Sequence, residues 1–181
     1  MNAADLIGVI QEQGRPLVES LFCEFRSNLG TSHYHRLSNE ELFRRGYGLY
    51  QHLVNWLTTR DAAAIHRMGE ELGRKRFAEG IPLGQVILAL ILQEKHLWKY
   101  TSNLDSEVDE KLRLEVAEFF ARAIYSIALG YEESLEESNR RARRSFALPN
   151  AAEADAPTHD STEEEDEIST SRSGQVGEFG G

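Results

Sequence analysis

Apolar residues recur along the first 146 positions at spacings of three and four, the period of an amphipathic α-helix. No stretch alternates apolar and polar residues as a half-buried strand does. The pattern therefore predicts an all-α fold, a bundle of about five to six helices. Their approximate ranges are 3–29, 38–57, 62–79, 83–102 and 105–144.

Local residue types set the predicted helix boundaries. Gly14 and Pro16 interrupt the first range, and proline lacks the amide hydrogen that an inner helical turn needs, so we expect a kink or two helices there. Ser38 and Glu41 have the spacing of a capping box. Asp61 is the expected N-cap of the helix that follows. Residues 30–37 are expected to form a connector.

Two further features concern helix packing. Gly69 and Gly73 lie four residues apart, so they leave a smooth groove on one helix face, and we expect close packing there to offset the helix-breaking cost of glycine. The range 105–144 carries an apolar stripe as far as Leu135 and is then polar. About 40 helical residues span roughly 60 Å, twice a 20-residue neighbour, so the end of this helix should project as a stalk, a linker or a partner contact.

The net charge of −10 belongs mostly to the end of the chain. Residues 147–181 contain nine acidic residues and one basic residue, with few aromatic residues, which predicts a disordered acidic tail. Residues 1–146 are nearly neutral and form the predicted helical sensor or regulatory domain. Such a charge distribution lacks the basic footprint of a nucleic-acid-binding protein.

The sequence also predicts the cellular setting. The N-terminus has no basic segment followed by an apolar run, and the longest strongly apolar run is only 86–92, so we expect a cytoplasmic protein without a membrane span. One cysteine, Cys23, excludes an internal disulfide framework and is expected in the core.

No catalytic or metal-binding motif is visible. The chain has no G-x-S-x-G, no glycine-rich phosphate loop and no H-E-x-x-H, so we expect no enzymatic activity and no catalytic residue. His33 and His35 flank one tyrosine, but two ligands do not make a site, so no metal is expected. His52 is expected to be exposed, and His96 is expected opposite the apolar stripe of its helix.

Three other residues are candidates for polar chemistry. If helices 62–79 and 83–102 form an antiparallel hairpin, Glu94 lies level with His66, and the two could form a buried polar pair that responds to pH. The alternative places Glu94 where the stripe meets solvent. Arg76 falls on an apolar stripe and could contact an anion or Glu94; the alternative is that its stem covers apolar surface while its head stays in water.

Residues 37–100 resemble a known family. The order is Leu-Ser-Asn-Glu-Glu-Leu at 37–42, Leu-Val-Asn-Trp-Leu at 53–57, Leu-Gly-Arg-Lys-Arg-Phe-Ala at 72–78, Glu-Gly-Ile-Pro-Leu at 79–83 and His-Leu-Trp at 96–98. This order resembles the N-terminal domain of the RsbT co-antagonist (RsbRD-type) family over about residues 3–140. The resemblance implies an all-helical, globin-like sensory domain that binds no haem, often dimerises and precedes a phosphorylatable output domain. This chain departs from that pattern, because its last predicted helix leads only to the acidic tail.

Three functional hypotheses follow. The first is a non-enzymatic domain of signal transduction or stress-response regulation, without a cofactor, that acts through protein partners and forms a homodimer through its first or last helix. The second is a globin-related protein that binds haem or another apolar ligand, with His66 or His96 as the ligating residue. The third is an adaptor that uses its acidic tail.

Overall fold

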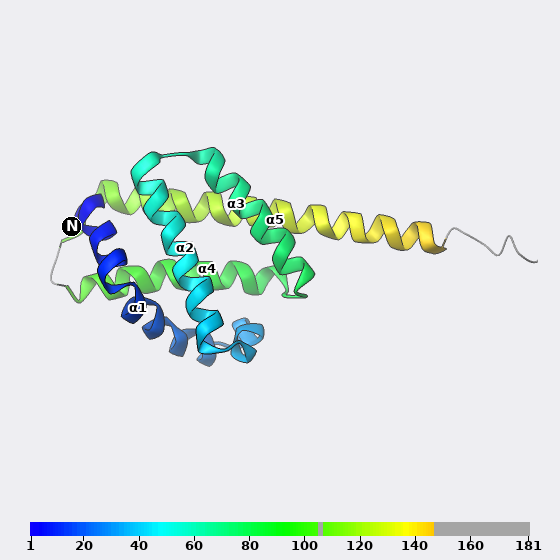
Figure 1. The fold of residues 1–181 in the computed structure, drawn as a ribbon, viewed down its shortest axis with the longest axis horizontal. Helices are drawn as coiled ribbons and strands as arrows, with labels where there is room; N and C mark the ends of the chain where they lie inside the picture. Colours follow the sequence, from blue (N-terminus) through cyan, green and yellow to red (C-terminus); the bar gives the residue numbers. More distant parts are fainter. Residues whose placement is uncertain (105–106, 147–181) are drawn as a thin grey trace, which may run out of the picture. The chain divides into compact units, whose positions relative to one another are not determined.

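The computed structural model describes residues 1–104 and 107–146, and every element in them is a helix, which confirms the predicted all-α fold (Figure 1). Residues 1–145 form one compact unit. No helix in the described ranges is both long and apolar enough to cross a bilayer. The predicted tail lies outside the described residues. The elements are α1 (Ala3–Ser27), the 3₁₀-helix η1 (Leu29–Arg36), α2 (Asn39–Thr59), α3 (Ala62–Ala78), α4 (Leu83–Ser102) and α5 (Glu110–Phe146).

Side chains cap the helices where the sequence predicts. The Oγ of Ser38 accepts a hydrogen bond from the amide of Glu41 at 3.1 Å, and a carboxylate oxygen of Asp61 accepts one from Ala64 at 3.0 Å. Both bonds satisfy amides that the first turn leaves free. The predicted box at α2 is only half formed, because the Glu41 carboxylate binds Arg45 instead of returning to the backbone.

The predicted break in the first helix is present. Gln13 has φ −115° and ψ 18°, so α1 kinks one residue before Gly14 and three before Pro16. A Cβ at Gly14 would lie 2.3 Å from the ring of Tyr47, so α2 crosses α1 where glycine gives room.

The expected connector at 30–37 joins α1 to α2, and it has a regular conformation that the sequence pattern did not predict. These residues wind into η1, because the Asn28 side chain accepts from the Gly30 amide at 2.9 Å and Thr31 Oγ1 donates to Phe25 O at 2.7 Å. Short-range polar bonds therefore order a segment that has no apolar period of its own.

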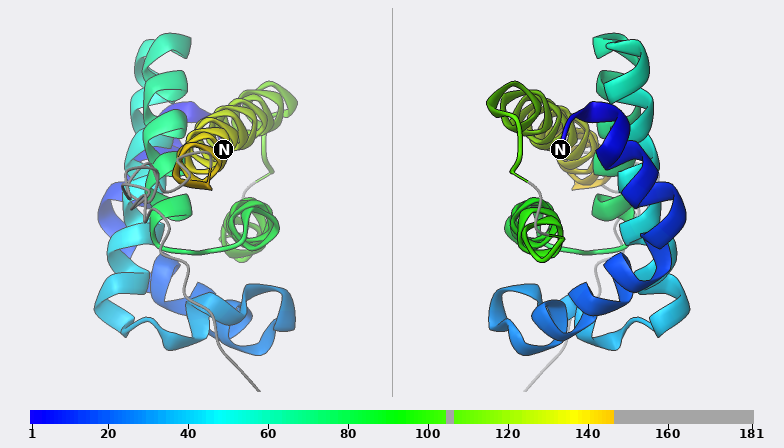
Figure 2. Two further views of the ribbon diagram at one scale, coloured as in Figure 1. Left: turned by 90° about the vertical axis from the view of Figure 1, so that its right-hand side faces the viewer. Right: turned by 90° about the vertical axis from the view of Figure 1, so that its left-hand side faces the viewer.

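The helices form two layers. Helices α4 and α5 run antiparallel, while α1, α2 and α3 cross them on one side; Figure 2 shows α4 and α5 nearly end-on and no described helix on the other side of α5. The C-terminal part of α5, drawn in yellow in Figure 1, extends beyond α4 as its length predicts.

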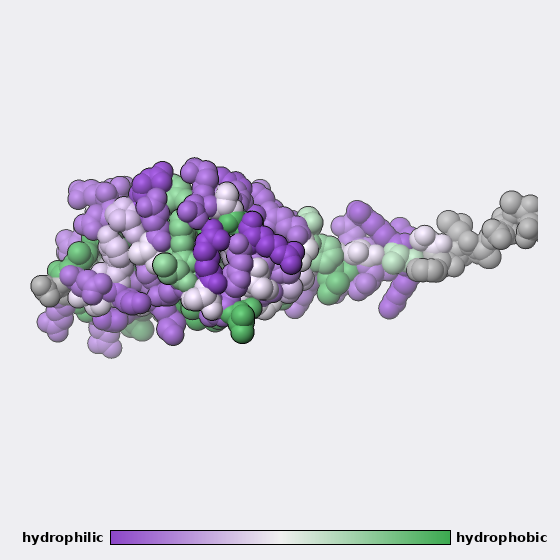
Figure 3. Space-filling model, turned by 90° about the horizontal axis from the view of Figure 1, so that it is seen from below, coloured by the Kyte–Doolittle hydropathy of each residue, from purple (hydrophilic) through white to green (hydrophobic). Residues whose placement is uncertain are grey.

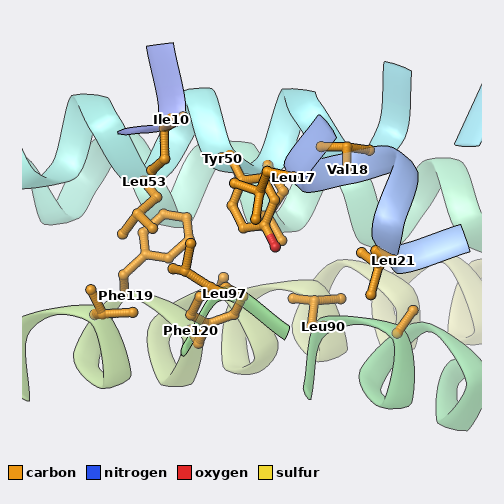
Figure 4. Close-up of a cluster of buried hydrophobic side chains, with 14 of the residues drawn as sticks. Ile10, Leu17, Val18, Leu21, Tyr50, Leu53, Leu90, Leu97, Phe119 and Phe120 are labelled. Carbon is orange, nitrogen blue, oxygen red and sulfur yellow. The ribbon is translucent and has the colours of Figure 1, made fainter. Parts of the chain in front are cut away.

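The core lies between these layers (Figure 4). Tyr50 is fully buried there, and its hydroxyl donates to the backbone oxygen of Gln93 at 3.0 Å, which joins α2 to α4. The labelled apolar side chains come from α1, α2, α4 and α5: Ile10, Leu17, Val18, Leu21, Leu53, Leu90, Leu97, Phe119 and Phe120.

The predicted close packing at Gly69 and Gly73 is confirmed, and its partner is α5. A Cβ at Gly73 would lie 2.1 Å from the backbone oxygen of Ile127, and one at Gly130 would lie 2.1 Å from that of Glu70. The two backbones therefore meet at a glycine seam, defined by residues 69, 73 and 130, that admits no side chain on either helix.

Candidate functional site

The predicted pair of His66 and Glu94 is not formed. Because the glycine seam holds α3 against α5, His66 lies beside α5: its Nδ1 is 3.0 Å from the Oγ of Ser126, and its Nε2 is 3.0 Å from the carboxylate of Glu70. Both ring nitrogens have polar neighbours, so His66 presents no free nitrogen to a haem or metal.

Glu94 is half-buried on α4, which agrees with the alternative that places it where the apolar stripe meets solvent. Burial raises the pKa of its carboxyl group, and the side chain of Trp98 partly opposes that rise. The half-buried charge is therefore unfavourable near neutral pH.

His96 is buried, contrary to the expected position opposite the packed face of its helix. It is 5% exposed because α1 covers that side of α4. Its Nε2 lies 2.8 Å from the Oγ of Ser20, and its Nδ1 lies 3.2 Å from Glu24, whose carboxylate also binds Lys99 at 3.1 Å. Burial raises the pKa of Glu24, but His96 and Lys99 outweigh burial and lower it overall.

This cluster has the order of nucleophile, base and orienting carboxylate that acyl-transfer enzymes use. Ser20 lies inside α1, however, where amides point to carbonyls four residues earlier and are not turned toward its Oγ. Its hydroxyl also donates to Leu17 O at 2.9 Å. An oxyanion needs such amide donors, so the arrangement is suited to linking α1 to α4.

A basic groove lies between α2 and α3. It has a volume of about 260 Å³, and a smaller cavity of about 40 Å³ shares four of its lining residues. The groove is lined by Arg44, Arg45, Gly48, Leu49, His52, Met68, Glu71, Leu72, Lys75 and Arg76. Of these, Arg45, Leu49, Leu72 and Arg76 also line the small cavity.

Arg76 does contact an anion, and that anion is Glu79. The side chain of Arg76 is 8% exposed, and its Nη1 donates to Glu79 Oε2 at 2.8 Å; Arg45 donates to the same oxygen at 2.9 Å. The alternative that its head stays in water is wrong. Burial raises the pKa of the neighbouring Tyr34, while Arg76 and Arg45 act in the opposite direction.

The outer side of α5 carries an apolar stripe without a covering helix. Leu114 and Tyr125 are 65% and 63% exposed, and Leu135 is 44% exposed. The alanines at 117 and 121 are also exposed between them. Figure 3 shows apolar residues where α5 leaves the bundle, on a surface that is otherwise mostly polar. We call residues 114, 117, 121, 125, 128 and 135 the outer stripe.

The exposure of the remaining candidate residues, His52 and Cys23, is as follows. His52 is exposed as expected, and desolvation in the groove lowers its pKa. Cys23 is exposed, so its predicted core position is wrong. Over the part of the chain that the structure describes, no group of three or more His, Cys, Asp or Glu residues could hold a metal ion.

Sequence reasoning missed Ser20, Glu24, Arg45 and Glu79 as partners. Two of the pairs had a local signal, Arg76 with Glu79 and Arg45 with Glu41, since residues three or four apart along a helix lie on the same face. The other contacts join separate helices.

Comparisons with protein-family models, curated proteins and solved structures found no match to this chain. The candidate sites therefore depend on the geometry of its own residues.

Proposed function

We propose that this chain is a non-enzymatic input domain of signal transduction, of the kind found at the N-terminus of RsbRD-type proteins, and that it acts in the cytoplasm through protein contacts as a homodimer. The observation that carries the proposal is the outer stripe of α5. Apolar side chains in a row on a helix favour contact with another protein surface.

The spacing of the outer stripe supports a helical partner. Its members are separated by three, four, four, three and seven residues, which keeps them on one side of α5. Small alanines between Leu114, Tyr125 and Leu135 allow two helices to approach closely. A second copy of the chain supplies the same stripe, and self-complementary contacts of this kind are the usual basis of twofold dimers.

Charges beside the stripe fit the same partner. Arg122, on the flank of the stripe, donates to Glu118 one helical turn earlier at 2.7 Å. Charged pairs that flank an apolar seam set the register and the orientation of paired helices. Because α5 extends beyond the bundle, a change at the bundle can reach a partner through this helix.

Light scattering after size exclusion tests the proposal on the full chain at several concentrations. We expect a dimer, and we expect Tyr125→Glu to convert it to a monomer because a charge cannot be buried unpaired in the seam. Gln51→Glu is the control, since it makes the same charge change at an exposed position of α2. A monomer at all concentrations, or equal behaviour of both variants, contradicts the proposal.

A further inference from the structure

We infer that the groove between α2 and α3 binds a small organic anion, with its carboxylate or phosphate head at Arg45 and Arg76 and an apolar tail over Leu49, Met68 and Leu72. This inference goes beyond the proposed function, because it concerns a ligand site on a different face from the outer stripe. A dimer can form without it, and the groove can bind without a dimer.

The charges around the groove favour an anion. Four bases line it, and the carboxylates near them are fewer. Glu79 binds two of the arginines, Glu41 binds Arg44 at 2.6 Å and Arg45 at 2.6 Å, and Glu71 lies in the wall. The bases are Arg44, Arg45, Lys75 and Arg76. These four bases outnumber the three carboxylates, so the groove keeps a net positive charge even when His52 is neutral.

Arg76 is a buried basic side chain at this site. Its side chain is more than nine-tenths buried, yet Arg76 lines both the groove and the smaller cavity. A guanidinium carries five N–H donors, and Glu79 with the Tyr34 phenol engages only part of this set. A carboxylate or phosphate matches the remaining donors in the two-point geometry that arginine favours.

The other wall of the groove favours an apolar tail. Leu49, Met68 and Leu72 line it, and a Cβ placed at Gly48 would have no other atom within 4 Å. Open space beside apolar side chains suits the hydrocarbon part of a small ligand. Inorganic phosphate would use the arginines alone and leave this wall in water.

A ¹⁵N NMR titration of the full chain tests the inference with four probes. Hexanoate and hexyl phosphate carry both the head and the tail, 1-hexanol has only the tail, and inorganic phosphate has only a charged head. We expect saturable shifts for at least one of the first two, at amides of α2 and α3 around Gly48 and Lys75. We expect binding at least tenfold weaker for the last two. A preference between hexanoate and hexyl phosphate identifies the head group.

Two matched glycine substitutions locate the binding. Gly48→Phe fills the open space in the groove, whereas Gly84→Phe places the same side chain at an exposed position of α4 that also has no neighbour within 4 Å. We expect hexanoate and hexyl phosphate to bind Gly84→Phe as they bind the natural chain, and to bind Gly48→Phe at least tenfold more weakly.

Arg76→Met tests the head group. It should weaken anion binding at least tenfold and leave any residual 1-hexanol contact unchanged. If this variant does not fold, Gly48→Phe still decides. The inference is overturned if neither anion gives saturable shifts, if 1-hexanol binds as well as hexanoate, or if Gly48→Phe binds both anions normally.

Discussion

The two sides of α5 differ in how much of their surface the rest of the chain buries. On the inner side, the backbones of α3 and α5 meet at the glycine seam, and Phe119 and Phe120 are fully buried. On the outer side, Leu114 and Tyr125 remain more than half exposed. The same helix therefore has one side that its own chain has packed and one that is available to another molecule.

The difference shows that small residues have opposite meanings on the two sides. At Gly73 and Gly130 the small size is required, because another backbone occupies the space where a Cβ would stand. At Ala117 and Ala121 the helix surface is open to solvent. Small residues in the sequence thus mark either a completed contact or a surface that permits one, and only the structure separates the two cases.

Gly130→Ala should produce the largest effect, because its Cβ would lie 2.1 Å from the backbone oxygen of Glu70. Relieving this clash requires the two helices to separate, so we expect a loss of about 3 kcal/mol or more in the free energy of unfolding. Urea denaturation measures this loss. Gly48→Ala is the control; it should be neutral or stabilising by up to about 1 kcal/mol, because alanine favours the helix. Similar losses in both variants would contradict the seam.

Removing a tyrosine hydroxyl in the core and, separately, one on the outer stripe compares the two environments. Tyr50→Phe deletes the buried hydrogen bond from its hydroxyl to Gln93 O, so we expect a loss of about 1 kcal/mol in thermal or urea unfolding. Tyr125→Phe makes the same chemical change on the exposed side and should alter the free energy of unfolding by less than about 0.5 kcal/mol. A loss of equal size at both positions would show that the two environments are not distinct.

The sequence predicts helix positions well because their causes are local. The caps at Ser38 and Asp61 and the kink near Pro16 each depend on a few neighbouring residues, and all three are confirmed. The 3₁₀-helix η1 was missed because side-chain bonds such as that of Thr31 stabilise it, and these leave no periodic pattern.

The candidate site was less predictable, and α4 shows why. Apolar residues lie on several sides of this helix, so the sequence does not determine which side is buried. The structure buries Gln93 and His96 and leaves Ile91 40% exposed, because α1 packs against the side that seemed polar. The pairing of Arg45 with Glu79 joins α2 to the end of α3, and that contact requires the tertiary fold.

Glu24 provides a smaller, pH-dependent test of a packed polar contact. Its pKa is lowered in the folded chain, so its stabilising contribution is present above the pKa of the unfolded chain and is lost as pH falls through the folded value. We expect Glu24→Gln to lower the free energy of unfolding by about 1 kcal/mol at pH 7, because the partners His96 and Lys99 lose a charge. Thermal melts between pH 3 and 7, chosen to bracket the ordinary pKa of about 4.3 for a glutamate, should show the two chains converging in acid. A constant difference would contradict this role.

Glu94 should behave in the opposite way, with the smallest effect. Burial raises its pKa, so its neutral form contributes stability below the pKa of the unfolded chain, and this contribution is lost as pH rises through the folded value. Glu94→Gln removes the charge, so it should stabilise the protein at pH 7 by up to about 1 kcal/mol and have little effect near pH 4. The same series of melts that tests Glu24 measures it. If Glu94→Gln instead destabilises the protein at pH 7, the carboxylate has a favourable partner, and this side of α4 is as fully used as the side that faces α1.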